Sequence, residues 1–157
     1  MGTRSLTHVI SSYIDDNTGK KKKVTLLTMY RQFDGYPSGM GADLVEFLDG
    51  GKVVNGLGSD ELKSKRVFNG AGCLAAQLVA NFKDGAGGIY IEPANAKNCG
   101  EEYVYEVETD YDTKEITLRC YEIGYIKGDK YINKKRLLFE GSPSDFSKYI
   151  EKEEEKA

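Results

Sequence analysis

The sequence is poor in the residues that carry most metal and nucleophile chemistry. It contains one histidine, three cysteines and no tryptophan. Cys73, Cys99 and Cys120 are odd in number and far apart, with no C-x-x-C pair and no histidine-rich segment nearby. This usage argues against a zinc or iron–sulfur site and for a reducing compartment. We therefore expect neither a metal nor a cofactor.

Familiar catalytic motifs are also missing. There is no G-x-S-x-G elbow, and the single histidine, His8, lies in an alternating segment where a structural role is the commoner one. The segment "GAGG" precedes an expected strand, whereas a phosphate-binding loop must precede a helix. Acid–base catalysis by paired carboxylates stays open among 25 acidic residues, although no spacing singles out one pair.

Charge and hydropathy limit the partners. The sequence has no apolar run long enough to span a bilayer and no charged-then-apolar leader, so we expect a soluble cytoplasmic protein that does not enter a membrane. A net charge of −3 removes general attraction to duplex nucleic acid but still allows a small anion to be held locally. The length is most simply one domain, 1–157.

Periodicity predicts the elements. Alternation of apolar and polar residues predicts strands at 6–14, 24–33, 87–93, 101–108 and 114–123, and "KGDK" predicts a further hairpin turn. Helical spacing predicts helices in "GADLVEFLDGG" and "GAGCLAAQLVANFKDG". The run Lys20 to Lys23 is expected to be a solvated loop, and segment 52–70 to be loop-like with strand character only at Val53 and Val54.

The C-terminal segment 141–157 predicts a short helix. Ser142 is a suitable N-cap, Pro143 fits the first helical position, and the acidic tail beyond Ile150 is expected to fray. The fold class that follows is α+β, an antiparallel sheet of about six strands with two helices packed on one face plus this C-terminal helix.

One strand-to-helix corner, "YRQFDGYPSGMGADL" (30–44), holds more polar and aromatic chemistry than a turn requires. Arg31 ends the strand, Asp34 begins the corner, and Pro37 restricts Tyr36 to an extended conformation. Helix starts after this corner and after Asn69 offer free amides to an anion, and ordinary capping by Ser38 and Asn69 is the alternative. A rigid aromatic ring and a charged fork beside such amides favour a binding corner.

Several segments resemble a known family. In order, "GTRSLTHV", "MYRQFDGYPSGMGADLVEFL", "VNG", "FNGAGCLAAQLVANFKDGAGGIYI" and "CGEEYVYEV" are similar to the phage-encoded anti-Thoeris sponge proteins of the first described family. The resemblance covers residues 2 to about 108. It implies a protein that sequesters, without cleaving them, the cyclic ADP-ribose isomers made by bacterial TIR-domain immune enzymes.

The resemblance also implies an assembly. It suggests a homo-oligomer in which the pocket lies at a dimer interface and dimers assemble into a hexamer. It also suggests that some relatives bind cyclic dinucleotides at separate sites. On this hypothesis we assign phosphate contacts to Arg31, Lys83 and Arg119, stacking on base or ribose to Tyr36, Phe82 and Tyr90, and polar contacts or shaping of the corner to Asp34, Ser38 and Asn69.

Alternatives remain for single residues and for the function. Phe82 continues an i, i+4, i+8 row with Leu74 and Leu78 and could be core, and Arg119 could form a cross-strand ion pair with Glu106. A second hypothesis is a nucleotide-cleaving enzyme that uses a carboxylate such as Asp34 or Asp43. A third is an inhibitor that docks on a host protein and binds no small ligand.

Overall fold

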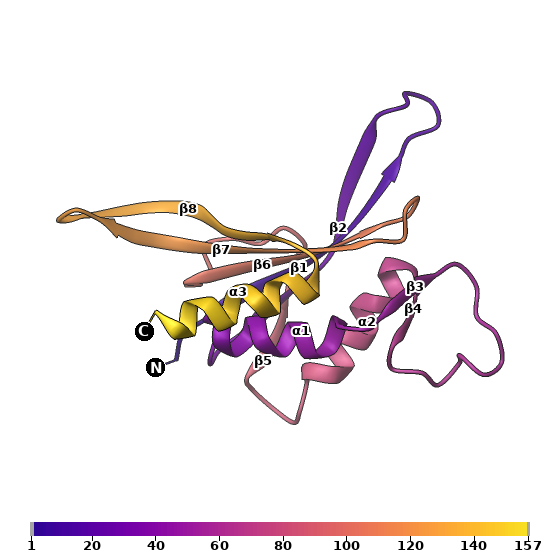
Figure 1. Cartoon of the computed structure of the whole chain (residues 1–157), viewed down its shortest axis with the longest axis horizontal. Coiled ribbons are helices and arrows are strands. Elements are labelled where there is room, and N and C mark those ends of the chain that lie inside the picture. Colours follow the sequence, from indigo (N-terminus) through magenta and orange to yellow (C-terminus); the bar gives the residue numbers. More distant parts are fainter. Residues whose placement is uncertain (1, 157) are drawn as a thin grey trace.

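A six-stranded sheet organises the computed structural model, which describes residues 2–156 (Figure 1). The strands are β1 (Ser5–Ile14), β2 (Lys21–Arg31), β3 (Lys52–Val54), β4 (Val67–Asn69), β5 (Ile89–Glu92), β6 (Tyr103–Asp110), β7 (Ile116–Lys127) and β8 (Lys130–Gly141). The helices are a π-helical turn, η1 (Pro37–Gly41), and α1 (Ala42–Leu48), α2 (Gly70–Phe82) and α3 (Pro143–Glu155). The predicted α+β class is confirmed.

The sheet has the strand order β5-β2-β1-β6-β7-β8. All neighbouring pairs run antiparallel except β1 and β6, which are parallel. The predicted six-stranded, mostly antiparallel sheet is confirmed, and its one parallel pair arises because the chain leaves the edge strand β5, crosses β2 and β1, and returns beside β1. β3 and β4 form a separate parallel pair, so segment 52–70 carries more regular structure than its sequence indicates.

The two faces of the sheet differ in what they contact. Register and alternation place Met29, Tyr105 and Leu118 on one face, called here the helix face, where they belong to the main hydrophobic core with residues of α1, α2 and α3. Figure 1 draws the three helices on the same side of the sheet. The opposite face, called here the outer face, carries Tyr30 and Glu106.

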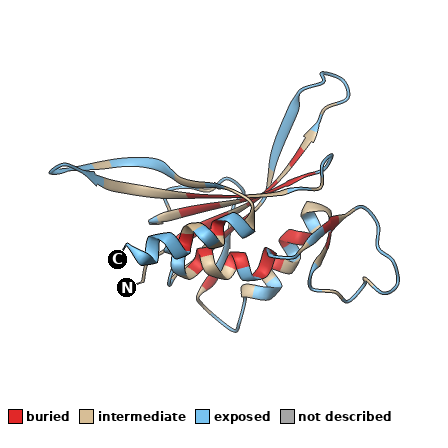
Figure 2. Cartoon of the chain, in the orientation of Figure 1, coloured by how far each residue is buried: buried red, intermediate tan, exposed pale blue. Residues whose placement is uncertain are grey.

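Two hairpins, β1–β2 and β7–β8, extend beyond the helices as arms (Figure 1). Figure 2 shows that buried residues concentrate where the strands meet the helices and that the arms are mostly exposed. The lysine run is not the solvated loop that was expected, since β2 begins at Lys21. Lys22 pairs with Asp15 at 2.7 Å, and Lys23 pairs with Glu108 at 3.0 Å.

The C-terminal helix begins as the sequence predicts. The Ser142 Oγ accepts a hydrogen bond from the Asp145 amide at 3.1 Å, and Pro143 occupies the first turn. The expected fraying beyond Ile150 is not seen, because α3 continues to Glu155. Phe146 and Ile150 are buried and anchor α3, and Phe146 lies 4.8 Å from the Phe139 ring centroid of β8.

Candidate ligand-binding cleft

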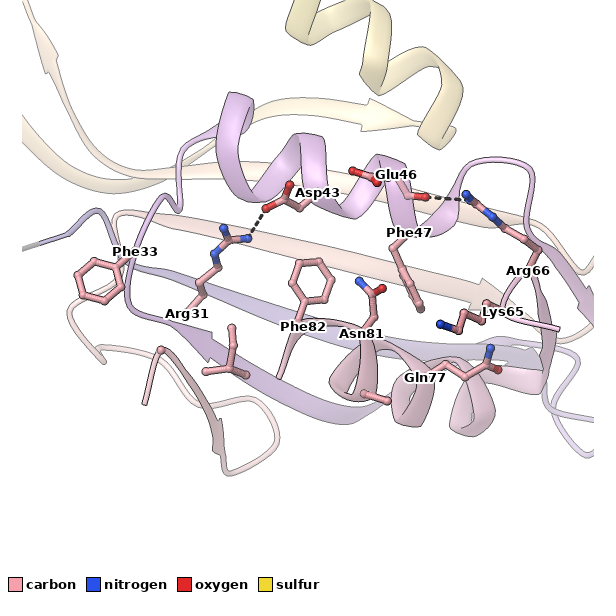
Figure 3. Close-up of a pocket in the computed structure, with 13 residues that line it drawn as sticks. Arg31, Phe33, Asp43, Glu46, Phe47, Lys65, Arg66, Gln77, Asn81 and Phe82 are labelled. Atoms are coloured by element: carbon pink, nitrogen blue, oxygen red, sulfur yellow. Dashed lines mark hydrogen bonds and ion pairs between the residues drawn. The ribbon is translucent and has the colours of Figure 1, made fainter. Parts of the chain in front are cut away.

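A cleft of about 700 Å³ lies between α1 and α2, beside the ends of β2 and β5 (Figure 3). Most of its side chains fall into three groups: aromatic rings, charged groups of both signs, and amides. Its lining comprises Arg31, Phe33, Asp43, Glu46, Phe47, Lys65, Arg66, Gln77, Ala80, Asn81, Phe82, Gly88 and Ile89. This volume lies within the range of about 300–1,000 Å³ that is usual for small-molecule sites.

Arg31 is held at one end of the cleft. Its Nη1 donates to Asp43 Oδ2 at 2.7 Å and contacts Met40 Sδ at 3.1 Å. Its guanidinium carbon lies 5.9 Å from the centroid of the Phe82 ring, so α1 and α2 both position the side chain. Because these hydrogen bonds use Nη1 alone, the remaining N–H groups have no protein acceptor within residues 2–156.

Aromatic rings form the floor of the cleft. The Phe47 and Phe82 ring centroids are 6.3 Å apart in an edge-to-face arrangement. Phe47 is buried and also packs on Phe68, at 5.3 Å, whereas Phe82 is half-buried. Phe82 packs against the hydrophobic core, as the alternative for this residue predicted, and it also lines the cleft, where its stacking role stays a prediction.

Two further cations stand at the other end of the cleft (Figure 3). Arg66 Nη1 donates to the Glu46 and Asp49 carbonyl oxygens, at 2.8 and 2.7 Å, and so binds the C-terminal end of α1. Lys65 is exposed, and neither Lys65 nor Arg66 forms an ion pair with a carboxylate of residues 2–156. Asp43 pairs with Arg31, and with Glu46 also in the lining the cleft carries Arg31, Lys65 and Arg66 against two carboxylates, a net charge of +1.

The sequence analysis missed Arg66, Lys65, Gln77 and Asn81. The two amides lie one turn apart on the same face of α2, and a polar i, i+4 pair in an otherwise apolar helix was the available signal. No comparable signal marked "KSKR" (63–66), because only the β3–β4 pairing brings this segment back to α1.

The corner 30–44 and the segment from Phe82 to Tyr90 hold most of the residues that were expected to bind a ligand. Each segment contributes some of its residues to the cleft. The corner contributes Arg31, Phe33 and Asp43, and the segment from Phe82 to Tyr90 contributes Phe82, Gly88 and Ile89. Among the residues assigned a binding role, Arg31 and Phe82 line the cleft. The remaining seven, Asp34, Tyr36, Ser38, Asn69, Lys83, Tyr90 and Arg119, do not.

The corner holds Tyr36 away from the cleft. Tyr36 is extended before Pro37, as predicted, and its hydroxyl donates to Asp34 Oδ1 at 3.1 Å, which raises the pKa of Tyr36. Ser38 does not cap a helix, since η1 starts after Tyr36 and has no side-chain cap.

Several amides of this corner that were expected to be free are occupied. The Gly35 amide donates to the Thr3 carbonyl at 2.9 Å, and the Met40 amide donates to the Asp34 carbonyl at 2.7 Å. This tight turn requires Gly39, because a Cβ there would lie 2.2 Å from the Asp34 carbonyl oxygen. The Gly35 and Met40 amides are therefore committed to contacts within the fold, and the residues of this region that line the cleft do so through their side chains.

Lys83 and Tyr90 serve other contacts. Lys83 Nζ donates to the Gly87 and Ile89 carbonyl oxygens, at 3.0 and 2.8 Å, and so closes the glycine-rich loop after α2. Tyr90 pairs in register with Tyr30 on the outer face, with ring centroids 5.9 Å apart. The alternation that places Ile89 in the cleft sends Tyr90 to the other side of the sheet.

Arg119 lies in an ionic network on the outer face. It donates to Glu108, to Glu140 at 2.7 Å and to Glu106 at 3.3 Å, so the alternative of a cross-strand pair with Glu106 is confirmed. Burial alone would raise the pKa of Glu108, but hydrogen bonds from Arg119 and Lys23 outweigh it and hold that pKa at about 2. Arg119 is thereby committed to three carboxylates on the face away from the cleft.

Asn69 precedes α2, but its side chain does not cap the helix. Its Oδ1 instead accepts a hydrogen bond from the Gly56 amide at 2.7 Å. His8, the single histidine, is hydrogen-bonded through Nδ1 to Thr28 Oγ1 at 2.7 Å, and burial lowers its pKa. Both residues thus have contacts within the fold.

Comparisons with known proteins give no relative: no family model, no curated protein and no solved structure matches this chain. Among residues 2–156, no helix is both long and apolar enough to cross a bilayer.

Proposed function

We propose that this chain binds a cyclic ADP-ribose-type nucleotide in the cleft and retains it uncleaved. The observation that carries the proposal is the arrangement of two phenylalanine rings, Phe47 and Phe82, between Arg31 at one end and Arg66 at the other. In this proposal the protein is a phage-encoded sponge that removes the signal of TIR-domain immune enzymes in the bacterial cytoplasm.

The ligand's chemistry fits each group of the cleft. A pyrophosphate is a dianion, and Arg66 and Lys65 supply positive charge without a carboxylate partner among residues 2–156. The half-buried Phe82 ring offers a surface for adenine, and stacking of this kind contributes about 1–3 kcal/mol per base. Gln77 and Asn81 carry the donors and acceptors that the polar edges of a base or ribose need.

The ion pair that Asp43 forms with Arg31 favours retention of the ligand over its cleavage. Asp43 Oδ2 accepts a hydrogen bond from Arg31 Nη1 at 2.7 Å, so this oxygen already has a cationic partner that it would have to give up to act on a ligand. Its position in the cleft nevertheless makes Asp43 the residue that a nucleotide-cleaving enzyme would use. The test must therefore distinguish binding from turnover.

Affinity and ligand fate can be measured with the same samples. Calorimetric titration with cyclic ADP-ribose isomers should give saturable binding, and ligand at 100 times its dissociation constant should add about 2.7 kcal/mol to stability. Phe82→Ala and Arg66→Gln should each weaken binding about tenfold or more. Tyr90→Ala, on the outer face, is the matched aromatic control and should bind as the wild type does.

Heat denaturation of the saturated complex then reports the fate of the ligand. Chromatography should recover the intact cyclic nucleotide. Recovery of a linear or hydrolysed product that Asp43→Asn abolishes would favour the enzyme. Absence of any binding by the isomers would favour an inhibitor that docks on a host protein.

The proposal includes a homo-oligomer, a dimer or a trimer of dimers, and cyclic dinucleotides as further ligands. The support for these parts is the resemblance of residues 2 to about 108. Native mass spectrometry of the protein purified beside an active TIR enzyme should give the subunit number and the bound mass together.

A further inference from the structure

A second, smaller cavity lies at the opposite end of α2 from the cleft. Its volume is about 40 Å³, and Gly70 and Ala71 of the first turn of α2 line it together with Ser11, Thr109, Tyr111 and Lys114. The cleft is lined by residues 77–82 of this 13-residue helix, so the centres of the two sites lie about 14 Å apart along its axis.

The first turn of α2 has unoccupied hydrogen-bond donors. The first amides of a helix have no acceptor within the helix, and the N-cap residue Asn69 gives them no side-chain acceptor. Positions Gly70 and Gly72 are also open, because a Cβ added at either would meet no atom within 4 Å. The positive end of the α2 dipole therefore faces accessible space.

Thr109 supplies an independent observation on the sheet side of the cavity. It is 2% exposed, and its Oγ1 has no hydrogen-bond partner within residues 2–156. Alternation with Val107 places its side chain on the helix face, and the parallel register sets Ser11 beside it. A buried hydroxyl without a partner destabilises the fold, and an acceptor on a bound ligand would offset this cost.

The charge at the rim is positive. Lys114 is half-buried and lines the cavity, and its Nζ donates to the Tyr111 carbonyl oxygen and lies 4.2 Å from the Tyr111 ring centroid, which leaves further N–H donors on the ammonium. The acidic residues of the same turn are occupied elsewhere. Asp110 pairs with Lys21, and Asp112 accepts from the Ile14 amide at 2.9 Å.

We propose that this cavity binds one tetrahedral oxyanion of the phosphate class, separately from the nucleotide cleft. The α2 amides, the Thr109 hydroxyl and the Lys114 ammonium are the donors, and helix starts are established places for such anions. The volume is a few times the space that one water needs, which accommodates a phosphate group but not a nucleoside.

Amide NMR tests the site directly. Titration of the wild-type chain with inorganic phosphate should give saturable shifts at Gly70, Ala71 and Gly72. Thr109→Val keeps the side-chain shape, so it should fold with unchanged or greater stability while phosphate affinity falls about tenfold or more. Lys114→Gln should also weaken binding, whereas Lys130→Gln, at an exposed hairpin tip, is the charge-matched control.

Other outcomes separate this site from the cleft and identify its ligand. Arg66→Gln should leave the phosphate shifts of α2 unchanged, so failure of the nucleotide proposal leaves this test intact. Tighter binding of glycerol 3-phosphate than of inorganic phosphate would assign the site to the phosphate end of a larger molecule, and the reverse would assign it to free phosphate. Absence of shifts at Gly70 to Gly72 with millimolar phosphate, or equal binding by Thr109→Val, would overturn the proposal.

Discussion

The ionic network of Arg119 gives the sharpest quantitative prediction. The Glu108 side chain is 8% exposed and depends on Arg119 and Lys23 for its charge partners. Its pKa of about 2, against an ordinary value of 4.5, corresponds to roughly 3 kcal/mol of stabilisation of the charged form. Arg119→Met removes the main partner, and since Lys23 remains, we expect the free energy of unfolding at pH 7 to fall by about 2–4 kcal/mol.

The lowered pKa of Glu108 determines how the effect of Arg119→Met on stability changes with pH. Because folding lowers the pKa of Glu108, its contribution is fully present above pH 4.5 and is lost as the pH falls toward 2. The difference between wild type and Arg119→Met should therefore be large at pH 7 and shrink below pH 4.5. Urea unfolding followed by far-UV circular dichroism at several pH values measures it.

A matched control separates this effect from ordinary surface charge. Arg136 pairs with Glu122 at 2.7 Å, but the Arg136 side chain is 47% exposed, so Arg136→Met should cost under about 1 kcal/mol. Arg119→Met should also leave nucleotide affinity at pH 7 unchanged, because Arg119 lies on the outer face. A loss that stays the same from pH 7 to pH 3, or a loss of nucleotide binding in the folded variant, would refute this reasoning.

Two further substitutions test the elements that frame the site. Gly39→Ala should destabilise the fold by about 2 kcal/mol or more, because the added Cβ would lie 2.2 Å from the Asp34 carbonyl oxygen, which accepts a hydrogen bond from the Met40 amide. The midpoint of thermal unfolding measures this loss. Ser142→Ala should cost about 1 kcal/mol through loss of the α3 cap, measured by urea unfolding, and a change below a few tenths would contradict the capping role.

Local patterns in the sequence predicted most of the elements. Alternation located the long strands, and the spacing of Leu74, Leu78 and Phe82 located α2 and its buried row. Ser142 and Pro143 marked the start of α3. Each of these signals depends on neighbours within one or two turns, which is why a single sequence contains it.

The site was predicted only in part, because its composition depends on tertiary pairing. Tyr90 and Arg119 carry suitable chemistry, yet the register of β5 and β7 places both on the outer face. Arg66 reaches the cleft because β4 returns beside β3, a pairing between two strands of three residues that leaves little trace in the sequence. Several corner amides were misjudged, since contacts within the fold occupy them.

A crystal structure of the protein with a cyclic ADP-ribose isomer is the most direct test of the central claim. The account predicts an intact ligand between α1 and α2, with adenine against Phe82 and the pyrophosphate near Arg66 and Lys65. A ligand bound on the outer face, or a hydrolysed product in the cleft, would contradict it.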